Sequence, residues 1–131
     1  MSGGGRVLLV EDDKFLRRAC EASLRQRGFD VVAATDGEEG LRLAREQPRF
    51  DVVLLDLIMP KVQGIEVLRA LKADPATASI PVVILSNSSR EEDKHEAVRL
   101  GAVGYYVKAN LSLKELAAQV GQLIADHAPP G

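Results

Sequence analysis

Hydrophobic residues in this chain form short continuous runs, separated by longer stretches in which apolar and polar positions mix. Continuous apolar runs of this length are typical of strands buried on both faces of a parallel sheet. Four runs predict such strands, at residues 7–10, 51–55, 81–85 and 105–107, and residues 30–34 form a fifth, weaker candidate.

The stretches between these predicted strands have the spacing of amphipathic helices. Helical patterns cover residues 16–24, 37–46, 63–73 and 90–100. The last one has a single apolar stripe formed by Leu113, Leu116, Ala117, Val120, Leu123 and Ile124, and Ser112 with Glu115 matches a capping box at its start. Five strand–helix repeats predict an α/β fold with a doubly wound, five-stranded parallel sheet and right-handed crossovers.

The chain has 131 residues, which fits one domain. We expect the domain to span residues 6–126, with a flexible segment at 1–5 and a tail or linker at 127–131. The net charge of −2 gives no electrostatic basis for direct binding to nucleic acid. No apolar run approaches the roughly 20 residues that cross a membrane. The first residues resemble no targeting peptide, so we expect a cytoplasmic protein without membrane contact.

The chain has one cysteine, Cys20, so no disulfide within the chain is possible. It lies at helical spacing from Leu16 and Leu24, and we expect it to be buried as a small hydrophobic residue. A reactive thiol is the alternative.

Polar side chains follow the predicted strands. In an open parallel sheet, functional groups gather at the carboxyl ends of the strands. The side chains at these ends are Glu11, Asp12 and Asp13, then Thr35 and Asp36, then Asp56, then Ser86, Asn87 and Ser88, and finally Lys108. Among these residues, Asp13 and Asp36 are expected to begin helices, since strand-end aspartates commonly serve as helix caps.

Carboxylates that converge on one sheet edge resist joint ionisation, and a hard divalent cation relieves this. Oxygen-only ligands favour Mg²⁺ over Zn²⁺. A carboxylate beside Mg²⁺ can attack phosphorus and form an aspartyl phosphate. Such a transfer needs positive charge and hydrogen bonds around the phosphoryl oxygens, which Lys108 and Ser86 can supply. The pattern predicts phosphoryl chemistry at Asp56.

Four motifs in order resemble the receiver domains of response regulators in two-component signal transduction. They are Val7–Asp13, then Asp56–Pro60 with Gly64, then Ser86, then Gly101–Lys108. The distances along the chain are 44 positions from Asp12 to Asp56, 30 to Ser86 and 22 more to Lys108. The resemblance runs from Arg6 to Asp126.

The resemblance implies a (βα)5 receiver fold with strand order 2-1-3-4-5. It also implies a role for each matching residue: Asp56 as phosphoacceptor, Asp12 as direct Mg²⁺ ligand, Glu11 as a ligand through water, Ile58 as a backbone carbonyl ligand, Ser86 as switch hydroxyl, Lys108 as the amine that pairs with the phosphoryl group, and Tyr105 as switch aromatic. The phosphoryl donor would be a sensor histidine kinase or a phosphotransfer protein. Phosphorylation would change the surface of the fourth helix, fifth strand and fifth helix, where an output partner would bind. Such a protein is a switch, not a turnover enzyme.

The sequence departs from the family pattern at Ala109, where relatives usually carry proline after a cis bond. The Lys108–Ala109 bond is therefore either cis and strained or trans with a rearranged loop. Ile58 is apolar and Asn87 is bulky at positions that border the predicted phosphoryl site, so Ile58 is expected either to exclude water or to pack against a loop.

Three other functions would require features that differ from those of this sequence. A phosphatase of the haloacid dehalogenase type would need a second aspartate where Ile58 stands. A flavin or nucleotide module would need a glycine-rich loop after the first strand, where acidic residues stand instead. An unphosphorylated pseudo-receiver would lack site residues that this chain has.

Overall fold

The computed structural model describes residues 4–47, 49–59 and 62–127. Five parallel strands form one sheet in the order β2-β1-β3-β4-β5. The strands are β1 (Arg6–Val10), β2 (Asp30–Ala34), β3 (Val52–Asp56), β4 (Val82–Ser86) and β5 (Gly104–Val107). The helices are α1 (Lys14–Gln26), α2 (Gly37–Glu46), α3 (Gly64–Ala73), α4 (Glu91–Arg99) and α5 (Leu113–Asp126), with a short 3-10 helix, η1 (Lys108–Asn110). The predicted fold class and strand order are confirmed.

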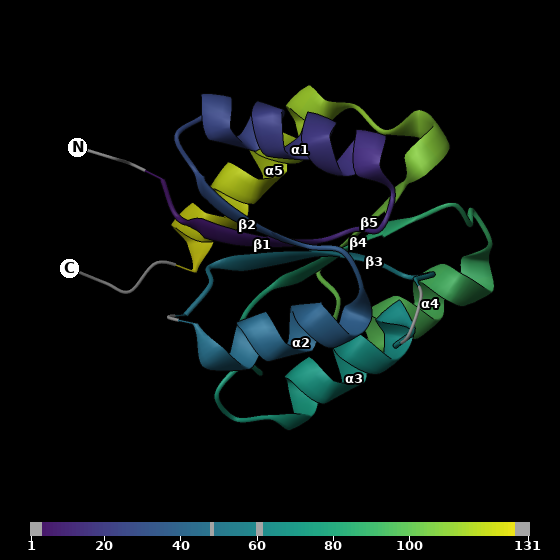
Figure 1. Ribbon diagram of the computed structural model, residues 1–131. Helices are drawn as coiled ribbons and strands as arrows, with labels where there is room; N and C mark the ends of the chain where they lie inside the picture. The colour runs from purple at the N-terminus through teal and green to yellow at the C-terminus, as the bar shows by residue number, and fades with distance from the viewer. Residues whose placement is uncertain (1–3, 48, 60–61, 128–131) are drawn as a thin grey trace.

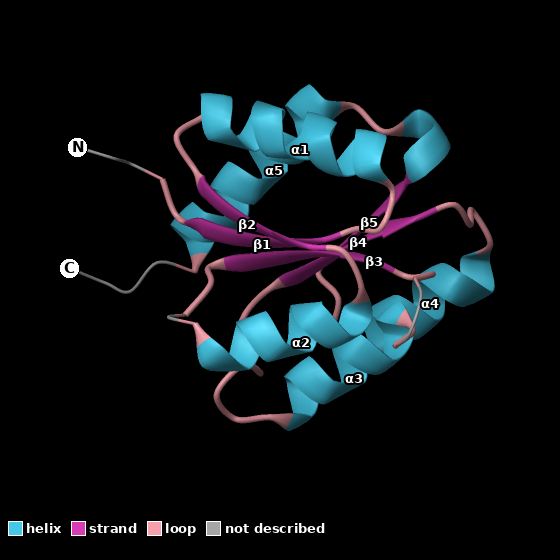
Figure 2. Cartoon of the chain, viewed as in Figure 1, coloured by secondary structure: helices cyan, strands magenta, loops and turns pink. Residues whose placement is uncertain are grey.

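The helices lie on both faces of the sheet (Figures 1 and 2). Helices α1 and α5 cover one face, while α2, α3 and α4 cover the other. The alternation along β1 shows how the sequence fills both layers, because Leu8 and Val10 join one core cluster and Val7 and Leu9 join the other. Cys20 is buried in the α1–α5 layer, as expected.

Strands β3 and β4 each end one residue later than the sequence pattern suggested. Asp56 pairs with Leu85 in the ladder, and Ser86 pairs with Val107. The parallel ladder depends on backbone pairing and not on side-chain polarity, so two polar residues that were expected after the strands are their last members. This places both side chains at the rim of a rigid sheet.

Polar side chains cap the N-termini of three helices, as the sequence predicted. Asp13 Oδ1 accepts a hydrogen bond from the backbone N–H of Leu16 at 3.0 Å. The caps at Asp36 and Ser112 accept from residues 39 and 115 at 2.8 and 3.2 Å. Asp13 is thus occupied as a cap, which separates its role from that of its acidic neighbours.

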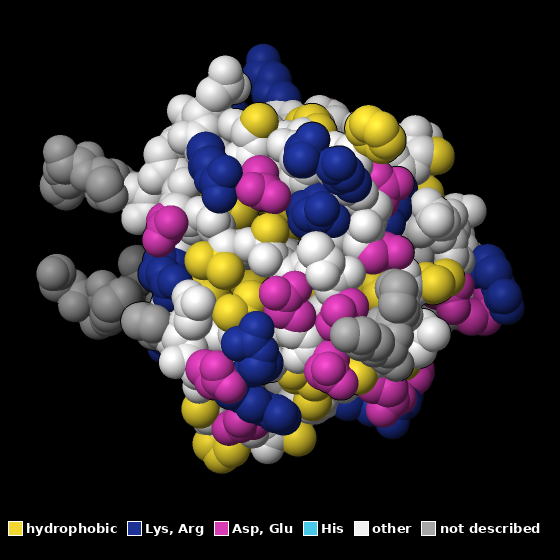
Figure 3. All heavy atoms as spheres, in the orientation of Figure 1, with side chains coloured by type: hydrophobic (Ala, Val, Ile, Leu, Met, Phe, Trp, Pro, Cys, Tyr) yellow, Lys and Arg dark blue, Asp and Glu magenta, His cyan; other side chains and the backbone are white. Residues whose placement is uncertain are grey.

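The described chain contains no cis peptide bond, so the Lys108–Ala109 bond is trans and Lys108 begins η1. Two parts of the predictions lie outside the described residues: segments 1–3 and 128–131 of the expected ends, and Pro60 of the second motif. The domain limits at 6 and 126 stay a prediction. No helix in the described ranges is long and apolar enough to cross a bilayer. On the face seen in Figure 3, basic side chains gather over α1, and both charge signs mix over α2 and α3.

Candidate functional site

Three carboxylates meet at the carboxyl edge of the sheet. Glu11 and Asp12 directly follow β1, and Asp56 ends the neighbouring strand β3. One carboxylate oxygen from each residue lies within 4.8 Å of the other two. Glu11 and Asp56 are buried, whereas Asp12 is exposed to solvent. The structure therefore brings together the three acidic side chains that the sequence singled out as metal ligands.

Lys108 reaches into this cluster from the end of β5. Its Nζ lies 3.0 Å from Glu11 Oε1 and 3.1 Å from Asp56 Oδ2. The lysine side chain is only 14% exposed, so the ammonium group is largely withdrawn from solvent and positioned between two buried carboxylates. The trans bond to Ala109 does not prevent this placement.

The charges in the cluster perturb one another strongly. Burial, followed by the nearby charge of Glu11, raises the pKa of Asp56 from 3.8 to about 7, although Lys108 opposes this shift. Burial lowers the pKa of Lys108, but hydrogen bonds to Glu11 and Asp56 outweigh that effect, so its pKa lies above the ordinary value. The single ammonium does not fully compensate for the carboxylates, and the site favours additional positive charge.

Backbone and side-chain hydrogen bonds fix the acidic turn after β1. The N–H of Asp13 donates to Glu11 Oε2 at 2.9 Å. Arg17 Nη1 donates to the carbonyl oxygens of Glu11 and Asp12 at 3.1 and 3.3 Å. The sequence did not single out Arg17, because an arginine on a helix carries no signal for a contact with backbone carbonyls in the preceding turn.

The turn after β3 holds Asp56 and explains the glycine of the second motif. The N–H of Ile58 donates to Asp56 Oδ1 at 3.2 Å. The N–H of Gly64 donates to Leu57 O at 2.8 Å. A Cβ atom at position 64 would lie 2.1 Å from the carbonyl oxygen of Asp56, so only glycine allows α3 to begin this close to the acceptor.

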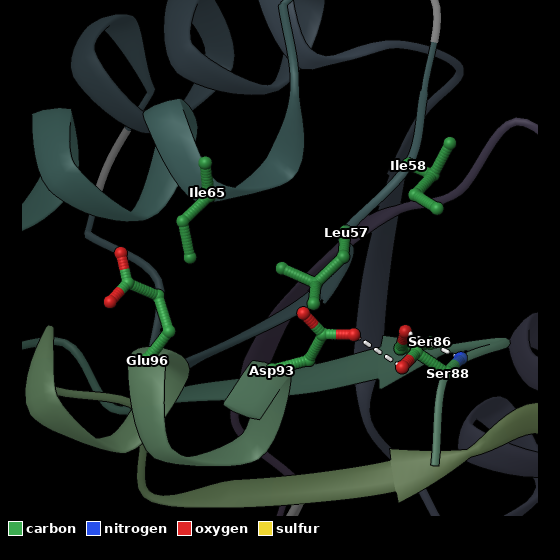
Figure 4. A pocket seen from close by; sticks show the side chains of 7 residues that line it. All are labelled: Leu57, Ile58, Ile65, Ser86, Ser88, Asp93 and Glu96. Atoms are coloured by element: carbon green, nitrogen blue, oxygen red, sulfur yellow. Dashed lines mark hydrogen bonds between the residues drawn. The ribbon is translucent and has the colours of Figure 1, made fainter. Parts of the chain in front are cut away.

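A cavity of about 290 Å³ lies between the turn that follows Asp56 and the start of α4 (Figure 4). Apolar side chains from the β3–α3 region form one wall, and polar side chains from β4 and α4 form the other. The lining residues are Leu57, Ile58, Ile65, Ser86, Ser88, Asp93 and Glu96. Ile58 is 63% exposed, which does not support the alternative that it packs against a neighbouring loop.

Ser86 and Tyr105 both connect to the loop after β4. Ser86 is buried, and its Oγ accepts a hydrogen bond from the N–H of Ser88 at 3.0 Å. Tyr105 is half-buried, and its hydroxyl donates to Ser88 O at 2.9 Å. The hydroxyl of Ser88 donates to Asp93 Oδ2. Sequence reasoning missed Asp93, although three acids in the first turn of α4 were a signal for a capping role.

The acidic cluster has the chemistry of a magnesium site. It offers oxygen ligands only, and it is the only group of three or more potential ligand residues within the described ranges. Glu11 Oε1 is buried and accepts no hydrogen bond from the described residues, although the Lys108 ammonium lies nearby. One ammonium beside three carboxylates leaves negative charge that a hard divalent cation would offset. The backbone carbonyl of Ile58 stays a predicted ligand.

Comparisons with known proteins show the family of this chain. Residues 7–120 match the family model of the response regulator receiver domain. The gliding motility regulatory protein of Myxococcus xanthus is 39% identical over 118 residues, which cover 90% of this chain and 15% of that protein. The chain spans about half the length of several transcriptional regulators that it also matches.

Two solved structures share the whole fold. The receiver domain of the Francisella response regulator 1452 has a TM-score of 0.87 and 31% identity, covering 94% of this chain and 98% of that one. The receiver domain of sensor histidine kinase PA1611 from Pseudomonas aeruginosa PAO1, with a magnesium ion coordinated in its active site cleft, has a TM-score of 0.84 and 28% identity, covering 94% and 99%. The chain belongs to the response regulator receiver domain family.

Proposed function

We propose that this receiver domain accepts a phosphoryl group on Asp56 in the presence of Mg²⁺ and acts as a phosphorylation-activated switch. One observation carries the proposal. A buried carboxylate at the end of β3 lies 3.1 Å from the half-buried ammonium of Lys108 and beside two further carboxylates that could hold a cation with it. Phosphoryl transfer needs this combination of a nucleophile and positive charge at one place.

Glu11, Asp12 and Asp56 would hold the magnesium ion, with Ile58 adding its backbone carbonyl. When bound, the ion supplies positive charge that offsets the carboxylates and the phosphoryl oxygens. The magnesium ion in the PA1611 receiver domain supports this part of the proposal.

In the transfer, one oxygen of Asp56 forms a bond to phosphorus while the bond between phosphorus and the donor breaks. The donor atom, a histidine nitrogen or the acetate oxygen of acetyl phosphate, keeps the electron pair of the broken bond. The Lys108 ammonium is positioned to pair with a phosphoryl oxygen, because it already contacts Asp56 Oδ2. The Ser86 hydroxyl then donates a hydrogen bond to another phosphoryl oxygen.

The output follows from the position of Ser86 and Tyr105. Both contact the loop between β4 and α4, so a shift of Ser86 toward Asp56 changes the surface of α4, β5 and α5. The phosphoryl group acts as a ligand that prefers one of two conformations. The donor is a sensor histidine kinase or a phosphotransfer protein, and the output partner binds the α4-β5-α5 surface.

Intact-mass measurement after incubation with acetyl phosphate and Mg²⁺ tests the proposal. We expect one added phosphoryl group on the wild-type chain. The group should be absent from Asp56→Asn, absent when EDTA removes the metal, and present in Asp13→Asn, since that residue caps α1. Equal labelling of Asp56→Asn, or labelling that EDTA leaves unchanged, would contradict the proposal.

A further inference from the structure

Ser88 joins three parts of the molecule through hydrogen bonds. Its N–H donates to the Oγ of Ser86 at the end of β4, at 3.0 Å. Its carbonyl oxygen accepts from the hydroxyl of Tyr105 on β5, at 2.9 Å. Its own hydroxyl donates to Asp93 Oδ2 in the first turn of α4. The serine therefore ties the proposed switch hydroxyl and switch aromatic to one carboxylate on a helix.

Ser88 also fixes how α4 begins. The residue before this helix, Arg90, makes no capping hydrogen bond with its side chain. Its backbone N–H instead donates to Ser88 Oγ at 3.1 Å. The hydroxyl oxygen of Ser88 thus orients the start of α4 while its hydrogen is directed to Asp93, as Figure 4 shows. These two contacts hold the loop in one position.

The loop between β4 and α4 borders a cavity into which it can move. Ser86, Ser88 and Asp93 all line the cavity of about 290 Å³ that separates them from Leu57 and Ile65. A shift of Ser86 toward Asp56 must either break its hydrogen bond with the N–H of Ser88 or carry Ser88 with it. The second route moves Ser88 away from Asp93, whose backbone belongs to the first turn of α4.

We propose that the contact between Ser88 and Asp93 is a latch that favours the unphosphorylated conformation and so sets how readily Asp56 takes a phosphoryl group. Both are positioning residues, since neither touches the acceptor. The inference rests on the proposed function of Asp56. A typical intramolecular hydrogen bond changes a two-state equilibrium about five- to tenfold, and loss of the latch should shift the resting population by that factor.

The test uses beryllium fluoride, which mimics a phosphoryl group on a carboxylate, titrated into the full chain with Mg²⁺. The chain has two tyrosines, so ¹⁵N-labelled tyrosine gives two backbone amide NMR signals, and Tyr105→Phe assigns them. We expect Ser88→Ala and Asp93→Ala to reach half-saturation at about five- to tenfold lower beryllium fluoride concentration than wild type. Without metal or fluoride, the Tyr105 signal of both variants should already move toward its bound position.

Matched variants separate the latch from general effects on α4. Ser89→Ala and Glu92→Ala remove a hydroxyl and a carboxylate from exposed neighbours and should behave as wild type. Ser88→Thr keeps the hydroxyl and should also behave as wild type. The double variant Ser88→Ala/Asp93→Ala should match Ser88→Ala, because the contact between the two side chains is already lost in that single variant.

Each outcome decides one claim. A wild-type chain that does not bind beryllium fluoride contradicts the proposed function of Asp56. If wild type binds but Ser88→Ala and Asp93→Ala match their controls, the latch is wrong while the phosphoacceptor proposal stands. Additive effects in the double variant, or weaker binding in the single variants, also overturn the latch.

Discussion

Replacing Asp56 with asparagine is expected to stabilise the metal-free domain at neutral and alkaline pH. The Asp56 side chain is 4% exposed, and folding raises its pKa from 3.8 to about 7, first through burial and then through the charge of Glu11. This difference corresponds to about 4 kcal/mol of unfavourable free energy when the group is ionised. Asparagine has nearly the same shape and no charge, and Lys108 keeps its contact with Glu11 in the variant.

The pH dependence follows from the direction of the shift. An acid with a raised pKa holds its proton more tightly in the folded state, so the folded state loses stability as pH rises from about 4 to about 7. Above that range the loss is complete. The raised pKa already includes the attraction between Asp56 and Lys108, so about 4 kcal/mol is the upper bound of the gain at pH 8. We expect a gain of about 2 kcal/mol, because the amide nitrogen of asparagine replaces one of the two carboxylate oxygens that the Ile58 N–H and Lys108 contact.

Urea unfolding in EDTA measures this gain, with wild type and Asp56→Asn compared at pH 8 and pH 5. The advantage of the variant should shrink at the lower pH. Asp13→Asn is the matched control, because asparagine also caps helices, and its stability should stay within about 0.5 kcal/mol of wild type. A variant that is no more stable than wild type at pH 8, or a gain that does not change with pH, would refute the electrostatic reasoning.

Three further predictions concern single side chains. Asp12→Ala should weaken Mg²⁺ binding at least about tenfold, because its carboxylate belongs to the cluster. Asp13→Ala should instead cost about 1 kcal/mol of stability and leave Mg²⁺ affinity unchanged, since it loses the cap to Leu16. Equal losses of Mg²⁺ affinity in titrations of the two variants would show that Asp12 is wrongly assigned as the metal ligand. Ile58→Asn should hasten decay of the phosphorylated protein severalfold after the donor is removed, because a polar side chain can hold the attacking water; unchanged decay would show that Ile58 does not control access. The Cys20 thiol, whose pKa burial raises to about 12, should react with a disulfide reagent only on unfolding, and prompt reaction of the folded chain would contradict its placement.

The elements that sequence reasoning predicted well are those in which side-chain pattern and backbone pairing agree. Helix α2 begins and ends where its apolar spacing and the Asp36 cap place it. Strands β3 and β4 extend one residue further than their apolar runs, because hydrogen bonding between strands continues through Asp56 and Ser86. Hydrophobic pattern alone cannot show where a ladder stops.

The candidate site likewise contains residues that the sequence predicted and a contact that it did not. Glu11, Asp56 and Lys108 lie at the carboxyl ends of strands that the topology brings to one edge of the sheet, so the sequence was sufficient to predict that they meet. The contact between Ser88 and Asp93 depends instead on how one loop turns back over the start of α4. Loop geometry of that kind is set by several weak hydrogen bonds at once, and no spacing rule encodes it.

Reductive mapping of the modified residue tests the central claim most directly. The wild-type chain is phosphorylated with acetyl phosphate and Mg²⁺, and borohydride then reduces the acyl phosphate, which converts the modified aspartate to homoserine. Peptide mass spectrometry should find homoserine at position 56 and aspartate at positions 12 and 13. Homoserine at position 12 or 13, or its absence from position 56 in a chain that carries phosphate, would contradict the account.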